Sequence, residues 1–250
     1  MKKWVARFIT TVLTVTTLFG TTVFAATPQT KECTQANQIA EICYQGYNEG
    51  VYGPIVVTKG TLENGWFNKK TVYLVALSGT EFVDNQSTGI LTDLKVGFNQ
   101  NNPYLRNVVS VISNNIPAGS NLILAGHSLG GMVAQQVAAN DTIKKNYNVL
   151  NTVTFGSPLI SEGNREGTVK RLGDTSDVVP YMSATGNLVW QVCGLNREDG
   201  GYGTDVMAAH VQSYLRSDLW GKYDVTGNKN GGAKLVLDLS TQTYYQSPTK

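Results

Sequence analysis

The sequence is poor in charged residues, histidine and cysteine, and each shortage excludes a class of protein. Charged residues make up 15% of the 250 positions, against about 25% in an ordinary soluble domain. The formal net charge is +2, so no basic surplus favours nucleic acid as a partner. Two histidines and three cysteines, with no Cys-x-x-Cys pair, argue against a zinc site. We therefore expect no metal, no cofactor and no nucleic-acid partner.

Long apolar runs are also missing, except at the N-terminus. Three basic residues within the first seven positions precede a Thr-rich apolar run, Phe8 to Phe24, which two alanines follow. This order is typical of a secretory signal peptide. An uncleaved anchor is the alternative, but five threonines between positions 10 and 17 weaken the run as a spanning helix. We expect residues 1–26 to be removed, the protein to be secreted without a transmembrane segment, and the remaining net charge to be −1.

The three cysteines, Cys33, Cys43 and Cys193, leave an odd thiol if one disulfide forms. The segment from Cys33 to Cys43 has a helical pattern, and ten helical steps span about 15 Å. A disulfide requires Cα atoms within about 7 Å. If that helix is continuous, any bridge must join Cys193 to one of the other two, and the pairing stays open.

Strand-like and helix-like patterns alternate along the rest of the chain. The strand patterns cover residues 71–79, 121–126, 148–158 and 167–174. The helix patterns cover residues 103–116, 131–141 and the second half of 205–219. Such alternation predicts a mostly parallel sheet with helices on both faces. We expect one α/β domain over residues 27–250, with the tail at 234–246 adding an edge strand.

One serine lies between two glycines where a predicted strand meets a predicted helix. Residues 126–130 read Gly-His-Ser-Leu-Gly, the Gly-x-Ser-x-Gly pattern that presents a nucleophile on a sharp strand-to-helix turn. Side chains at Gly126 and Gly130 would collide with neighbouring chain, so glycine is needed at both. We expect Ser128 to be a nucleophile. The N–H of Leu129, at the start of the helix, is the expected oxyanion donor.

A serine nucleophile needs a base, and the scarcity of histidine leaves one candidate. His127 adjoins Ser128, and adjacent side chains diverge on such a turn, so the predicted base is His210. The acid that orients it is expected between Ser128 and His210, after a strand. Asp177, followed by Val-Val-Pro, is favoured; Asp174, in a turn-like run, remains the alternative.

A second oxyanion donor is expected from another strand end, well before the serine. Ser78-Gly79-Thr80 closes the strand pattern at 71–79, where the second backbone N–H of such a site usually originates. Thr80 is the candidate, and its hydroxyl offers an additional hydrogen bond.

Several short motifs occur in an order that points to one family. They are LSGTE (77–81), TDL (92–94), GHSLGG (126–131), TFGSP (154–158), DVVP (177–180), and His210 with Tyr214. With this set, over about residues 70–215, the chain resembles the class 3 (fungal-type) lipases of the α/β-hydrolase superfamily. It departs from that family at Ser78, where the family usually has Arg, and in the segment 81–91, a lid position with few bulky apolar residues.

The resemblance implies an α/β-hydrolase fold and a Ser128, Asp177 and His210 triad with oxyanion donors at Thr80 and Leu129. The expected activity is that of a secreted serine carboxylester hydrolase, a lipase or esterase, acting on ester or lipid substrates, the lipid–water interface included. A phospholipase or feruloyl-type esterase on the same fold is the alternative. A hydrolase-like protein that binds without catalysis is the candidate from another class.

The assignment of His210 as base predicts a pH dependence. A histidine must be neutral to accept a proton, so ester hydrolysis should fall as the pH drops through about 6–7. Initial rates with a short-chain nitrophenyl ester between pH 5 and 8 measure this. A flat profile over that range would contradict the assignment.

Overall fold

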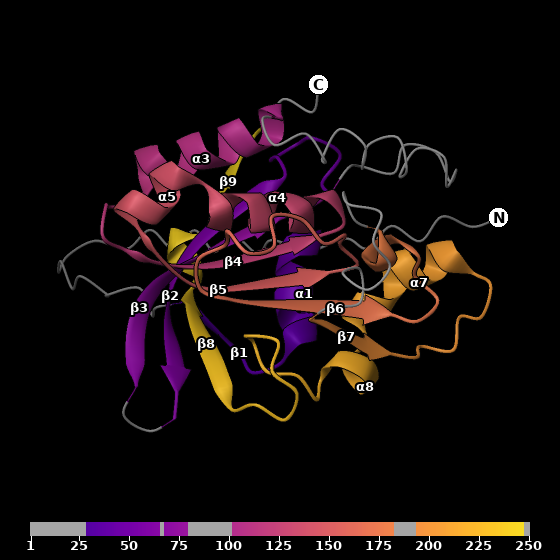
Figure 1. The fold of residues 1–250 in the computed structure, drawn as a ribbon. Coiled ribbons are helices and arrows are strands. Elements are labelled where there is room, and N and C mark those ends of the chain that lie inside the picture. The colour runs from indigo at the N-terminus through magenta and orange to yellow at the C-terminus, as the bar shows by residue number, and fades with distance from the viewer. Residues whose placement is uncertain (1–28, 66–67, 80–101, 183–193, 248–250) are drawn as a thin grey trace, which may run out of the picture.

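A nine-stranded sheet forms the centre of the molecule (Figure 1). The computed structural model describes residues 29–65, 68–79, 102–182 and 194–247. The expected signal peptide, Thr80, the lid position at 81–91 and Cys193 lie outside the described residues.

The strands follow the order β1-β8-β2-β3-β4-β5-β6-β7, and β9 also pairs with β2. Their bounds are β1 (Thr30–Cys33), β2 (Ile55–Asn64), β3 (Lys69–Leu77), β4 (Asn121–His127), β5 (Asn148–Phe155), β6 (Thr168–Asp174), β7 (Leu195–Glu198), β8 (Ala233–Asp238) and β9 (Thr243–Tyr245). Strands β3 to β7 pair in parallel, whereas β1, β2, β8 and β9 pair antiparallel. The parallel strands with helices on both faces confirm the predicted α/β architecture.

Helices cover both faces of this sheet (Figure 1). The helices are α1 (Ala36–Tyr44), α3 (Pro103–Asn115), α4 (Leu129–Ala139), α5 (Asp141–Asn146), α7 (Val206–Gln212) and α8 (Ser217–Trp220). Short 3-10 helices lie at Val179–Tyr181, Ser213–Leu215 and Leu239–Thr241. Figure 1 shows α3, α4 and α5 on one face and α1 and α8 on the other. None of the helices in the described ranges is long and apolar enough to cross a membrane.

The two faces of strand β4 bury side chains in two separate cores. Leu122 and Leu124 pack with α3 and α4. Ile123 and Ala125 pack with α1. Successive side chains of a strand point to opposite faces, so a strand covered on both sides reads as a continuous apolar run. His127, two residues beyond Ala125, continues the α1 face, where its ring contacts Tyr44 at the end of α1.

Helix α3 begins at a cap that the sequence provides. Pro103 occupies the first turn, and the Asn102 side chain accepts a hydrogen bond of 2.7 Å from the Leu105 N–H. Such an arrangement satisfies a backbone donor that the helix leaves without a partner. Asn102 also donates to the side chain of Gln136 on α4 at 3.1 Å. The cap therefore fixes α3 against the helix that follows Ser128.

Two predictions for the C-terminal part are confirmed only in part. The tail at 234–246 holds two strands. Among the described strands β9 pairs with β2 alone and lies at the edge as predicted, whereas β8 lies inside the sheet, paired with β1 on one side and β2 on the other. Its alternate residues Leu235 and Leu237 pack into the core on the α1 side, which favours an inner position. The second half of 205–219 is helical as predicted, in the 3-10 helix Ser213–Leu215 and in α8. The first half also forms a helix, α7, which the Asp205 side chain caps by accepting from the Ala208 N–H.

Cys33 and Cys43 are both buried and form no disulfide with each other. Cys33 ends β1 and Cys43 lies in α1, which is continuous from Ala36 to Tyr44. Burial raises the pKa of the Cys43 thiol to about 12. That thiol is therefore protonated and unreactive at neutral pH.

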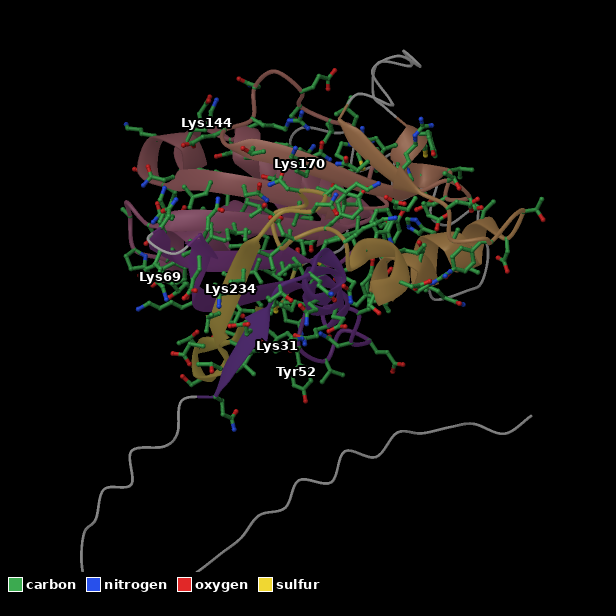
Figure 2. The ribbon with its side chains drawn as sticks, turned by 90° about the horizontal axis from the view of Figure 1, so that it is seen from below. Lys31, Tyr52, Lys69, Lys144, Lys170 and Lys234 are labelled. Carbon is green, nitrogen blue, oxygen red and sulfur yellow. The ribbon has the colours of Figure 1, made fainter. Side chains whose placement is uncertain are left out.

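The labelled lysines with an ion-pair partner lie beside carboxylates rather than forming a patch of unpaired positive charge. Figure 2 labels Lys144 apart from Lys31, Lys69 and Lys234, of which Lys69 and Lys234 share the carboxylate of Glu63. Each lies within 3.5 Å of a carboxylate oxygen. Exposed ion pairs of this kind contribute little stability, but they leave the surface electrostatically mixed.

Candidate active site

The turn between β4 and α4 holds Ser128 in an unusual backbone conformation. Ser128 has φ 55° and ψ −125°, a region that L-residues rarely adopt. Two backbone hydrogen bonds of 3.0 Å hold it there: the Ser128 N–H donates to Phe155 O, and the Gly131 N–H donates to Ser128 O. This strain places the serine side chain at the carboxyl end of β4 and directly before the N-terminus of α4.

The glycines on either side of the serine are required by close backbone contacts. A Cβ on Gly126 would lie 2.3 Å from the carbonyl oxygen of Gly130. A Cβ on Gly130 would lie 2.4 Å from the carbonyl oxygen of Leu77, at the end of β3. Only glycine fits at these two positions without displacing the main chain.

Ser128, His210 and Asp177 lie together at this edge of the sheet. His210 Nε2 is 3.0 Å from Ser128 Oγ, and His210 Nδ1 is 2.8 Å from Asp177 Oδ2. Because the carboxylate accepts a hydrogen bond from Nδ1–H, Nε2 carries the lone pair and accepts a hydrogen bond from the serine hydroxyl. The exposed fractions are 4% for Ser128, 1% for His210 and 0% for Asp177. The three predicted residues therefore form one buried hydrogen-bonded chain.

Three donors fix the Asp177 carboxylate. Its Oδ2 accepts from His210 Nδ1 and, at 2.6 Å, from the Tyr214 hydroxyl; its Oδ1 accepts from the Val179 N–H at 2.9 Å. Desolvation, with the nearby Asp177 charge as a smaller cause, raises the pKa of Tyr214 well above its usual value. Tyr214 therefore stays protonated and donates to the carboxylate.

Asp174, the alternative acid, has a different environment. Its Oδ2 accepts from the Ser213 hydroxyl at 2.6 Å, and its Oδ1 accepts from the Ser176 N–H at 2.9 Å. The Ser213 contact joins the end of β6 to the segment that follows α7, and the Ser176 contact closes the turn after β6. Between the two candidates, Asp177 is the one whose carboxylate lies at hydrogen-bond distance from His210.

The backbone around the serine offers one described donor for an oxyanion. Leu129 is the first residue of α4, and no acceptor for its N–H is found among the described residues. At the end of β3, the Ser78 N–H donates to Pro54 O and the Gly79 N–H donates to the Tyr47 hydroxyl. Both of those amides are engaged within the protein. Thr80, the predicted second donor, lies outside the described residues.

Sequence reasoning missed several residues that surround this site. Gly156 has φ 56°, and a Cβ there would lie 2.8 Å from Asp177 Oδ2 and 3.1 Å from His210 Nδ1. The TFGSP motif carried that signal. Tyr44, the last residue of α1, and Tyr47, three residues further on, reach His127 with their hydroxyls. Nothing in the local pattern of α1 distinguishes them from ordinary core aromatics.

Within the described ranges, no group of three or more His, Cys, Asp or Glu side chains could hold a metal ion.

The family model of the PGAP1-like alpha/beta domain matches residues 31–170, more than half of the chain. The protein belongs to this family. The PGAP1-like family is of the α/β-hydrolase type, in agreement with the parallel sheet and the turn at Ser128. The matched range includes Ser128, whereas Asp177 and His210 lie beyond it. Comparison with curated proteins and with solved structures gives no match.

The close backbone contacts of Gly130 predict the effect of an alanine substitution on the stability of this PGAP1-like domain. Gly130→Ala should lower the free energy of unfolding by about 3 kcal/mol or more, because the new Cβ meets rigid backbone. This loss exceeds the gain of about 1 kcal/mol expected for alanine within a helix. Chemical denaturation measures the difference.

Gly232→Ala is the matched control, because a Cβ at Gly232 meets no atom within 4 Å. Its free energy of unfolding should stay within about 0.5 kcal/mol of the wild type. Equal stabilities of the two variants would contradict the close approach of Gly130 to β3.

Proposed function

We propose that the protein is a secreted serine carboxylester hydrolase that acts on lipid-type esters through the triad Ser128, His210 and Asp177. The observation that supports this most is the buried chain from Ser128 Oγ through His210 to Asp177, with contacts of 3.0 and 2.8 Å. The strained conformation of Ser128 adds support, because strain of this kind is concentrated at functional sites. Secretion rests on the pattern of residues 1–26, and the proposed hydrolase domain covers residues 27–250.

In the proposed reaction, His210 Nε2 takes the proton of Ser128 as its Oγ attacks the ester carbonyl. The imidazolium that forms is stabilised by the Asp177 carboxylate 2.8 Å away. His210 then donates the proton to the departing alcohol, leaving an acyl group on Ser128. A water molecule, deprotonated by the same histidine, hydrolyses that acyl-enzyme and frees the acid.

The negative oxygen of the tetrahedral intermediate requires two donors. The Leu129 N–H lies at the N-terminus of α4, where the helix dipole favours negative charge. Because the Ser78 and Gly79 amides are already engaged, the next amide along the chain, that of Thr80, is the proposed second donor. This deduction agrees with the Gly-Thr pair that the resemblance to class 3 lipases singles out.

Two observations favour an ester with an apolar acyl group. The domain is of the α/β-hydrolase type, for which a lipid substrate is a natural class. Val178 and Leu215, the chain neighbours of Asp177 and Tyr214, are among the exposed large hydrophobic side chains of the residues that the structure describes. A phospholipase or feruloyl-type esterase would use the same triad, so a panel of acyl lengths and head groups identifies the substrate.

Ser128→Ala should fold normally and lose essentially all ester hydrolysis, because the variant lacks the attacking oxygen. Turnover of a short-chain nitrophenyl ester, with circular dichroism to verify folding, measures this. Ser110→Ala, an exposed serine on α3, is the matched control and should keep full activity. Retained turnover in Ser128→Ala would refute the proposed nucleophile.

Substitution of two neighbouring buried aspartates, Asp177 and Asp174, distinguishes loss of the catalytic acid from a general loss of stability. In Asp177→Asn, either orientation of the amide sets its NH2 group against an N–H or O–H donor, from Val179 or from His210 and Tyr214. The imidazolium also loses its counter-charge. We expect kcat to fall by about 10⁴-fold, as expected for a triad acid.

Asp174→Asn is the control for this substitution, because an amide can still pair with Ser213 and Ser176. Its kcat should change by less than about tenfold, roughly 1.4 kcal/mol in barrier height. A larger loss in Asp174→Asn than in Asp177→Asn would reverse the assignment of the acid.

A further inference from the structure

His127, the residue before the proposed nucleophile, belongs to a chain of hydrogen bonds, here called the relay. The relay joins the end of β3 to the backbone of His210. Its Nδ1 is 2.7 Å from the Tyr47 hydroxyl, and its Nε2 is 2.9 Å from the carbonyl oxygen of His210. The Tyr47 hydroxyl in turn accepts from the Gly79 N–H at 2.8 Å. The relay thus runs from the end of β3, through Tyr47 and His127, to the backbone of the proposed base.

One protonation pattern satisfies every member of this relay. A carbonyl oxygen only accepts, so His127 Nε2 carries the proton and donates to His210 O. The Tyr44 hydroxyl, 3.1 Å from Nε2, donates to the same carbonyl oxygen at 3.3 Å. His127 Nδ1 then holds a lone pair, to which the Tyr47 hydroxyl donates. Desolvation lowers the pKa of His127 well below its usual value and raises that of Tyr47. Both side chains are therefore neutral, as the relay requires.

The same contacts exclude His127 as a second base. Each of its ring nitrogens already faces a partner, Tyr47 on one side and His210 O on the other. Its ring also lies against the His210 ring, with centroids 4.7 Å apart, so it packs beside the proposed base instead of replacing it.

The elements joined by the relay need such a connection. Helix α7, which carries His210, has seven residues, fewer than the roughly 12–15 at which an isolated helix becomes marginally stable. Its position therefore depends on tertiary contacts. At the other end, a Cβ on Gly79 would lie 2.7 Å from the Tyr47 hydroxyl and 2.9 Å from Ser128 Cβ. Gly79, Tyr47 and Ser128 are therefore closely packed, so a shift of Tyr47 changes the space around Ser128.

We propose that Tyr47 and His127 are positioning residues, which hold the turn after β3 and the backbone of His210 at the separation that the reaction needs. This inference rests on the proposed function, because it assumes that Ser128 and His210 react. In this inference Tyr47 and His127 do not contact the substrate. They act through the residues that they hold in place.

The test uses the full-length protein with three substitutions: Tyr47→Phe, His127→Gln and Tyr244→Phe. Tyr47→Phe removes the hydroxyl, and His127→Gln keeps a donor toward His210 O but loses the acceptor for Tyr47. Tyr244→Phe removes a hydroxyl that bonds to the side chains of Gln242 and Gln45 and not to His127, and is the control. Active sites are titrated with a fluorophosphonate, and kcat and KM for a short-chain ester are expressed per titrated site.

Both relay variants should lose about ten- to a hundredfold in kcat per titrated site, since small displacements near reacting groups cost that much. The KM of both variants should change by less than about threefold, because the contacts with the substrate are kept. Tyr244→Phe should match the wild type. A purely structural role would lower the number of titrated sites and leave kcat per site unchanged, which would overturn the inference. A folded wild type that takes up no fluorophosphonate would reject the proposed function and this inference together.

Discussion

The hydrogen bond between Asp177 Oδ2 and His210 Nδ1 is the interaction on which the rest of the site depends. It fixes which ring nitrogen of His210 carries the proton, and so leaves Nε2 to accept from Ser128. A carboxylate that is completely buried is costly unless donors surround it. Val179 and Tyr214 supply the remaining donors, and Gly156 leaves the space in which the carboxylate and the imidazole meet.

The fold delivers these groups to one place because parallel strands end at a common edge of the sheet. Ser128 follows β4, Gly156 follows β5 and Asp177 lies just beyond β6. The two-residue alternation along β4 brings His127 to the α1 face, where it meets Tyr44 and Tyr47. A one-residue shift of that strand would exchange its two faces and remove the relay to His210.

Much of the parallel part of the sheet could be predicted from the sequence, because strands covered on both faces are continuous apolar runs. The outer strands β1 and β7 lack that signal, because they are four residues long and only partly apolar, and they were missed. The tail was predicted to add one edge strand, which β9 does; the inner position of β8 was missed, since its pairing with β1 depends on contacts across some 200 residues of sequence.

For the candidate site, the scarcity of histidine led directly to His210, and its hydrogen bonds with Ser128 and Asp177 are contacts that no local pattern contains. The roles of these residues in catalysis stay predictions, and they converge on one chemical event at Ser128. Treatment of the folded protein with a fluorophosphonate, followed by peptide mass spectrometry, examines that event. We predict one adduct per molecule, on the peptide that contains Ser128. A folded protein that takes up no label, or takes it up on another residue, would contradict this view of the site.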